Sequence, residues 1–172
     1  TAMDQGLFIW LEAPMKDELL QEYQQLRSRL TQSIIPSGYT HYSAEFIRQG
    51  IQLNAWDAGR FDATVVGGLT TALELLMIAN AAGLPIEIQS WGHALSQATN
   101  LHLMLANDQT RYFEAPMPGQ PYEFGMKNGI VLQKGRIFAP ETPGLGIEVD
   151  WNRLDTADFY TRRVACEQRN PC

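Results

Sequence analysis

The stretch FDATVVGGLTTALELLMIANAAGLPIEIQSW, residues 61–91, decides the fold because it holds a complete strand–helix–strand unit. Residues 61–66 are apolar and rich in β-branched side chains, which predicts a short strand that two glycines then end. Apolar residues recur at helical spacing over 69–82, and a Gly-Leu-Pro turn stops that helix. Residues 86–90 predict the second strand. Because one helix joins the two strands, we expect them to be parallel, with a right-handed crossover.

Polar side chains stand at the ends of this unit. Asp62 belongs to the first strand, and Gln89, Ser90 and Trp91 close the second. Parallel α/β sheets carry their chemistry at the C-terminal ends of their strands. These residues are therefore the first candidates for a functional site.

The same rhythm extends outward through the first two thirds of the chain. Asp17 and Ser43 are suitable N-cap residues for two earlier helices. Alternating strands and helices predict a parallel α/β sheet. The expected strands lie near residues 7–11, 33–36, 61–66, 86–90 and 111–115.

After residue 116 the character of the sequence changes. Glycine and proline recur, helical periodicity disappears, and residues 129–139 predict a hairpin that turns at a Lys-Gly pair. We therefore divide the chain into residues 1–116, which carry the alternating strands and helices, and residues 117–172, a hairpin and tail that pack on them.

Composition excludes several classes of function. The chain has 172 residues and a net charge of −6, and it lacks the clustered Lys and Arg of nucleic-acid-binding proteins. It also lacks an apolar run of the roughly 20 residues that a membrane helix needs. The first residues, TAMDQGLF, do not have the pattern of a signal peptide. Cys166 and Cys172, both in the polar tail, are too sparse for a disulfide framework. A cytoplasmic protein with two reduced thiols is expected, without a nucleic-acid or membrane partner.

Several short motifs follow one another in a fixed order. In that order and spacing the chain resembles the mandelate racemase and muconate lactonizing enzyme family of the enolase superfamily, on its racemase and acid-sugar dehydratase side. The motifs are Glu12-Ala13-Pro14, Asp62 to Thr70 (DATVVGGLT), Phe113-Glu114-Ala115-Pro116, Gly129-Ile130-Val131 and Pro143-Gly144-Leu145-Gly146-Ile147.

The resemblance implies an incomplete, half (β/α) barrel. Members of the family have a capping domain and a modified eight-stranded barrel, and this chain matches the part from the fourth barrel strand to the C-terminus. The family's Lys-x-Lys base and first metal-binding Asp have no counterpart in this sequence. Because the first predicted strand begins almost at residue 1, we expect the chain to be a piece of something longer.

The resemblance also implies a magnesium site that holds a small carboxylate ligand and stabilises an enediolate. Glu12 matches a family metal ligand at a strand end, and a carboxylate suits a hard cation. An ordinary surface glutamate is the competing interpretation. Tyr39 stands where the family has a third, acidic ligand, and a neutral phenol is a poor magnesium ligand.

The proton-transfer groups of the family are only partly matched. Asp62 matches the Asp that orients a His base in racemase-like members, but Gln89 stands at the position of that His. A glutamine cannot accept the proton, so the dyad is broken. Glu114 matches a Glu that binds or protonates the developing carboxylate oxygen, although a glutamate at a strand end needs no such role.

Three further side chains are candidate substrate contacts, namely Tyr39, Trp91 and His93. His93 lies four residues after Gln89, and His41 lies two residues after Tyr39. Either imidazole is therefore a candidate to reach the site at the C-terminal ends of the strands. An ordinary loop histidine is the competing interpretation of both.

Strand alternation makes a separate prediction for Glu87. It shares a side of its strand with Gln89, whereas the two isoleucines of this strand face the other side. If the isoleucines meet helices, Glu87 points into the barrel interior, where a carboxylate must be paired or protonated. Arg60 and Arg111 are its candidate partners.

Five strands cannot close a barrel, so the inner face and two sheet edges would stay open. We expect a homo-oligomer, most simply a dimer that covers this face; the alternative is that the missing N-terminal part of a longer chain covers it. Two functions remain open: a degenerate, non-catalytic relative of a metal-dependent acid-sugar dehydratase or racemase, or part of an active lyase or isomerase.

Overall fold

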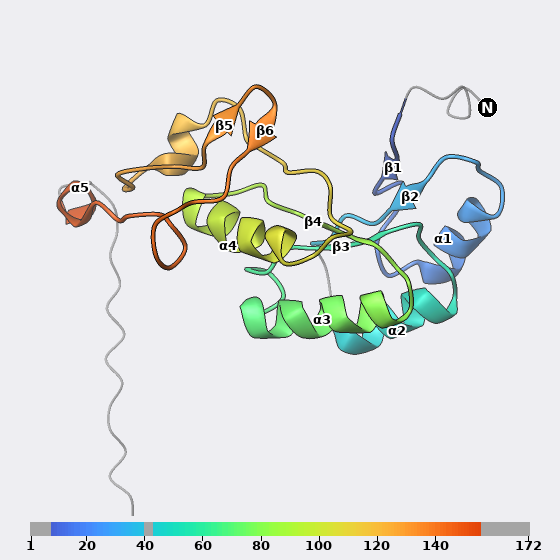
Figure 1. Ribbon diagram of the computed structural model, residues 1–172. Helices are drawn as coiled ribbons and strands as arrows, with labels where there is room; N and C mark the ends of the chain where they lie inside the picture. The colour runs from blue at the N-terminus through green and yellow to red at the C-terminus, as the bar shows by residue number, and fades with distance from the viewer. Residues whose placement is uncertain (1–7, 40–42, 156–172) are drawn as a thin grey trace, which may run out of the picture.

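The computed structural model describes residues 8–39 and 43–155 (Figure 1). The first part alternates strands and helices: β1 (Leu11–Glu12), α1 (Leu20–Arg27), β2 (Ile34–Ile35), α2 (Ala44–Gln52), β3 (Gly59–Phe61), α3 (Leu69–Ala81), β4 (Ile86–Ile88) and α4 (Ala94–Leu105). The second part contains a 3-10 helix (Gln120–Glu123), β5 (Leu132–Gln133), β6 (Arg136–Ile137) and α5 (Trp151–Asp155).

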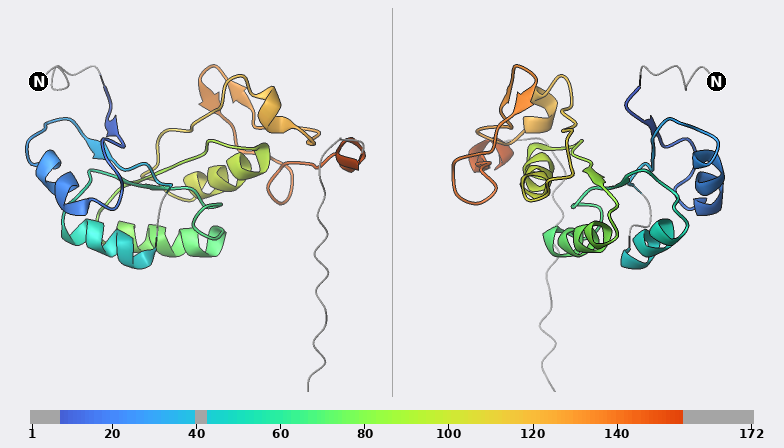
Figure 2. Two further views of the ribbon diagram at one scale, coloured as in Figure 1. Left: turned by 180° about the vertical axis from the view of Figure 1, so that it is seen from behind. Right: turned by 45° about the vertical axis from the view of Figure 1, so that its right-hand side comes forward.

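The described strands of the first part form two parallel pairs. β1 pairs with β2, and β3 pairs with β4 in a register that sets Arg60 opposite Glu87. Helices α1 to α4 follow one another in an arc, with the strands on its inner side (Figure 2). The parallel α/β class is therefore confirmed, as is the hairpin, in which β5 and β6 pair antiparallel across Lys134 and Gly135, both at positive φ.

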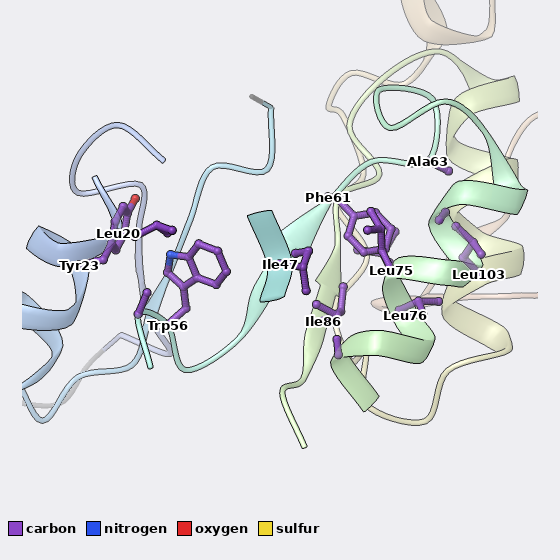
Figure 3. Close-up of a cluster of buried hydrophobic side chains, with 14 of the residues drawn as sticks. Leu20, Tyr23, Ile47, Trp56, Phe61, Ala63, Leu75, Leu76, Ile86 and Leu103 are labelled. Atoms are coloured by element: carbon purple, nitrogen blue, oxygen red, sulfur yellow. The ribbon is translucent and has the colours of Figure 1, made fainter. Parts of the chain in front are cut away.

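The core lies between the strands and the helices (Figure 3). The isoleucines of β4 and Phe61 of β3 are buried against α3, as the alternation of the strands predicts. A second part of the core surrounds Trp56, whose ring packs edge-on against Tyr23 and also meets Phe46. The opposite side of β3 and β4 is left for Arg60 and Glu87.

The predicted strand 61–66 is wrong in its position. β3 ends at Phe61, and the next residues form a helical turn in which the backbone N–H groups of Val65 and Val66 donate to the carbonyl of Asp62. The Asp62 carboxylate also accepts from Thr64, and this local bonding overrides the strand preference of the β-branched run.

The predicted fifth strand, 111–115, is also wrong, because these described residues carry no strand. They run beside β4 but are joined to it through side chains instead of a backbone ladder. The Thr110 hydroxyl donates to the Ile86 carbonyl (2.5 Å), and the Ser90 hydroxyl accepts from the Glu114 N–H (2.7 Å).

Of the two predicted helix caps, Ser43 is confirmed and Asp17 is wrong. Ser43 caps α2 as expected, by accepting from the Phe46 N–H. Asp17 does not cap α1, which begins after Leu19; its buried carboxylate accepts instead from the backbone N–H groups of Ser37 and Gly38. Asp17 thus fixes the loop that carries Tyr39. No helix in the described ranges combines the length and apolar character needed to cross a bilayer.

Candidate functional site

Arg60 is at the centre of the strand ends. Its charged side chain is only 2% exposed, which is unusual for an arginine. Phe61 beside it packs in the helical core, so Arg60 points to the opposite, inner side of β3. Its guanidinium forms ion pairs with two glutamates: Nη1 lies 3.4 Å from Glu12 Oε2, and Nη2 is bound to Glu114 Oε1. One buried cation therefore joins the end of β1 to the segment after α4.

Ser90 holds Glu114 in place for this contact. The Ser90 hydroxyl donates to the Glu114 carbonyl (3.1 Å) and accepts from its N–H (2.7 Å). Ser90 is itself fully buried at the end of β4. The two glutamates that motif order singles out, Glu12 and Glu114, are thus brought together, but around an arginine.

Asp62 is bound elsewhere. Only 3% exposed, it accepts at Oδ1 from the Thr64 N–H (2.7 Å), the Thr64 hydroxyl (2.8 Å) and Asn100 Nδ2 (2.8 Å). Asn100 on α4 returns a second bond, since its Oδ1 accepts from the Ala63 N–H (2.9 Å). Asp62 therefore fastens the turn after β3 to α4, and no imidazole in the described ranges hydrogen-bonds to it.

Gln89 lies directly after β4, 3% exposed, and its backbone N–H donates to the Phe61 carbonyl (2.9 Å). Its Oε1 is buried without a hydrogen-bond partner among the described residues. A neutral amide at this point can orient a polar ligand, but it cannot take up a proton.

Tyr39 is half exposed in the loop after β2. Burial of its hydroxyl, and then the negative charge of Glu114, raise the pKa of Tyr39, while Arg60 acts in the opposite direction. These electrostatic partners place the phenol at the same strand ends. The raised pKa keeps it neutral near pH 7, so it is not a carboxylate-like ligand.

His93 and Trp91 lie apart from this cluster. His93 caps α4: its Nδ1 accepts from the Leu95 N–H (3.4 Å), and its Nε2 lies 2.9 Å from the Phe124 carbonyl, which requires Nε2 to carry the proton. Trp91 meets Tyr122 edge-on, with 5.8 Å between ring centroids. Both side chains therefore tie the end of β4 to the segment around 120–124. His41 lies outside the described residues.

Glu87 points to the inner side, as strand alternation predicts. Burial raises the pKa of the Glu87 carboxyl, and the backbone N–H groups of Arg111 and Tyr112 partly oppose this effect. The Arg111 N–H lies 3.3 Å from Glu87 Oε2. Its partner is thus the backbone of Arg111, whereas the guanidinium of Arg60 is paired with Glu12 and Glu114.

These residues do not fit a magnesium ion. Glu12, the one matched metal ligand, is paired with Arg60, and Tyr39 offers a neutral phenol. Within residues 8–39 and 43–155, no three His, Cys, Asp or Glu side chains gather as a set that could hold a metal. A hard divalent cation requires several oxygen ligands, preferably carboxylates.

Arg60 and Asn100 are the site residues that motif matching does not find. Arg60 could have been found from the alternation of β3, which puts it on the inner face next to Glu87. No sequence signal identifies Asn100, because its bond to Asp62 depends on how α4 packs against the turn after β3.

Comparison with known proteins extends over most of the chain. The family described as Enolase C-terminal domain-like matches residues 2–153. A protein from Pseudovibrio sp., provisionally named a mandelate racemase/muconate lactonizing enzyme, has a solved structure with 34% identity and a TM-score of 0.88, covering 92% of this chain and 43% of that chain. The chain therefore spans less than half the length of this relative.

Two further proteins are more distant. An enolase from alpha proteobacterium bal199, solved with bound Mg, has 22% identity and a TM-score of 0.75 over 90% of this chain and 40% of that chain. The D-Ala-D/L-Ala epimerase of Cytophaga hutchinsonii is 29% identical over 98 residues, which cover 56% of this chain and 27% of the epimerase. Since the family match covers nearly the whole chain, the protein belongs to the Enolase C-terminal domain-like family of the enolase superfamily, among its mandelate racemase-like members.

Proposed function

We propose that this chain is a non-catalytic relative of metal-dependent acid-sugar dehydratases and racemases, built as a half (β/α) barrel. The supporting observation is the bonding of Asp62. Its carboxylate accepts from Asn100 and Thr64, and no imidazole of the described residues hydrogen-bonds to it, so it stabilises a turn instead of orienting a base. Gln89 fills the place of that base with a neutral amide.

Exchange of the proton α to a carboxylate tests this proposal without knowledge of the product. The chain is incubated in D₂O with magnesium and a panel of sugar-acid and hydroxy-acid carboxylates, and the α-proton signal is followed by NMR. We expect exchange at the rate of the protein-free blank. Exchange that grows with protein concentration would overturn the proposal.

The alternative is that the chain forms part of an active lyase or isomerase. One observation favours it: the Pseudovibrio sp. relative contains the matching fold within a chain more than twice as long. The chain would then gain exchange activity when mixed with the part of that relative which this chain lacks. The rate of α-proton exchange is measured for the mixture, and each component alone serves as the control.

We infer that a second copy of this chain covers the inner face of the half barrel. A groove of about 540 Å³ opens there, with Ile9, Trp10 and Tyr112 among its apolar walls. The same groove carries both Asp108 and Arg111, so a two-fold axis can set the arginine of each copy against the aspartate of the other. The remainder of a longer barrel is the competing occupant.

A further inference from the structure

We propose that Arg60 is a built-in cation that takes the charge-neutralising place of a metal ion at the strand ends and excludes divalent cations from them. The proposal concerns the same strand ends as the proposed function, but it does not depend on it, because cation binding is measured without substrate.

The Arg60 side chain is buried at the strand ends. A cation that is 2% exposed is tolerated only when its charge is paired. Both partners of Arg60 are carboxylates, Glu12 and Glu114, whose side chains are 43% and 28% exposed. The buried guanidinium of Arg60 thus neutralises the charge of two carboxylates that are more accessible to solvent than it is.

Both carboxylates already have Arg60 as their ion-pair partner. A magnesium ion at Glu12 and Glu114 would either sit next to the guanidinium, where like charges repel, or displace it. Displacement would leave Arg60 as a buried cation without a carboxylate, an unfavourable state.

Asp62 and Tyr39, the other candidate oxygen ligands of the sequence analysis, are poor ligands for a cation in this structure. Asp62 is held by Asn100 and Thr64, and Tyr39 is a neutral phenol. Within the part of the chain that the structure describes, no third Asp, Glu, His or Cys side chain gathers with Glu12 and Glu114, so a cation that displaced Arg60 would find two carboxylates. The site is balanced for one fixed positive charge and not for a divalent ion.

Two substitutions of the same residue separate charge from fold. In Arg60→Met the two glutamates lose their cation, whereas Arg60→Lys keeps a positive charge on a similar stem. Thermal unfolding is followed with and without about 10 mM MgCl₂ against NaCl of equal ionic strength, and binding heat is measured by titration calorimetry. We expect no magnesium effect on the wild type or Arg60→Lys, and a rise in Tm with millimolar binding for Arg60→Met that Glu12→Gln then abolishes.

Two results would overturn the proposal. One is magnesium binding by the wild type that Glu12→Gln removes; the other is a folded Arg60→Met variant that gains no magnesium affinity. If Arg60→Met does not fold, the test is the broadening of amide NMR signals when Mn²⁺ is added to the ¹⁵N-labelled wild type. Unchanged amide signals of Glu12 and Glu114 support the exclusion of divalent cations, and selective broadening of these signals contradicts it.

Discussion

At the scale of single residues, Asp62 and Arg60 have their roles set by their neighbours. Asp62 has the residue type and the position expected of a catalytic aspartate, yet its three hydrogen bonds are structural. Arg60 belongs to none of the motifs that carry the family resemblance, yet it holds together two of the matched glutamates. The residue types could be read from the sequence, but the distant partners Glu12, Asn100 and Glu114 could not, because they come from β1, α4 and the segment after α4.

The structural role of Asp62 makes a prediction about stability. Asp62→Ala removes the acceptor of three hydrogen bonds and leaves the buried amide of Asn100 without its partner. We expect the free energy of unfolding to fall by about 2–4 kcal/mol. Urea denaturation measures the change, and Glu141→Ala, at an exposed carboxylate, serves as the matched control. A loss no larger than that of the control would contradict the structural role.

Glu87 makes a prediction about pH. Its pKa is raised in the folded chain, so between its ordinary pKa and the raised value the folded state binds more protons than the unfolded state. This carboxyl therefore lowers stability as the pH rises through that window. Glu87→Gln should be more stable than the wild type at about pH 8, and the difference should shrink towards about pH 5. Urea denaturation across pH measures it; a constant difference would show that the ionisation of Glu87 has no part in it.

At the scale of elements, the sequence predicts which segments are helical better than where strands end. The helices after Ser43 and Gly68 begin as expected, because caps and turns are local signals. The strands are shorter than expected, since the bonding of Asp62 and Thr64 converts 62–66 into a turn. Residues 111–115 lie beside β4 without a ladder, a detail of side-chain bonding that periodicity does not encode.

The packing of helix α2 against Trp56 can be tested at one glycine of this helix. Gly50 lies within this helix, and a methyl group there would overlap the ring of Trp56. Glycine is normally the weaker helix former by about 1 kcal/mol, so Gly50→Ala should stabilise an isolated helix. In the folded chain we expect it to destabilise by about 1–3 kcal/mol instead.

Thermal or urea unfolding of Gly50→Ala gives the answer, with the exposed position Gln52→Ala in the same helix as control. A stabilised Gly50→Ala variant would mean that Trp56 does not pack against this helix as described.

At the scale of the whole molecule, the alternation of strands and helices indicates the parallel α/β class, whereas the resemblance to the family rests on the order and spacing of short motifs. What remains a proposal at this scale is the cover of the inner face, because a single chain contains no information about a partner's position. Tyr112 on that face is 43% exposed, and Ile9 is 59% exposed.

Self-association has a direct measurement in size-exclusion chromatography with light scattering. We expect the wild-type chain to give the mass of a dimer, and Arg111→Glu to give a monomer because it turns an attractive pair with Asp108 into a repulsive one. Arg48→Glu, at an exposed position of α2 that does not line the groove, is the matched control and should stay dimeric. A wild-type monomer at all concentrations would leave the remainder of a longer barrel as the occupant.

Because the acidic groups at the strand ends are bound to protein partners, we propose that this chain does not abstract a proton α to a carboxylate. The most direct measurement is the α-proton NMR signal of each sugar acid in D₂O, recorded at several protein concentrations with magnesium present. We expect identical decay of this signal with and without the chain. Decay that is proportional to protein concentration, and that Asp62→Asn abolishes, would contradict it.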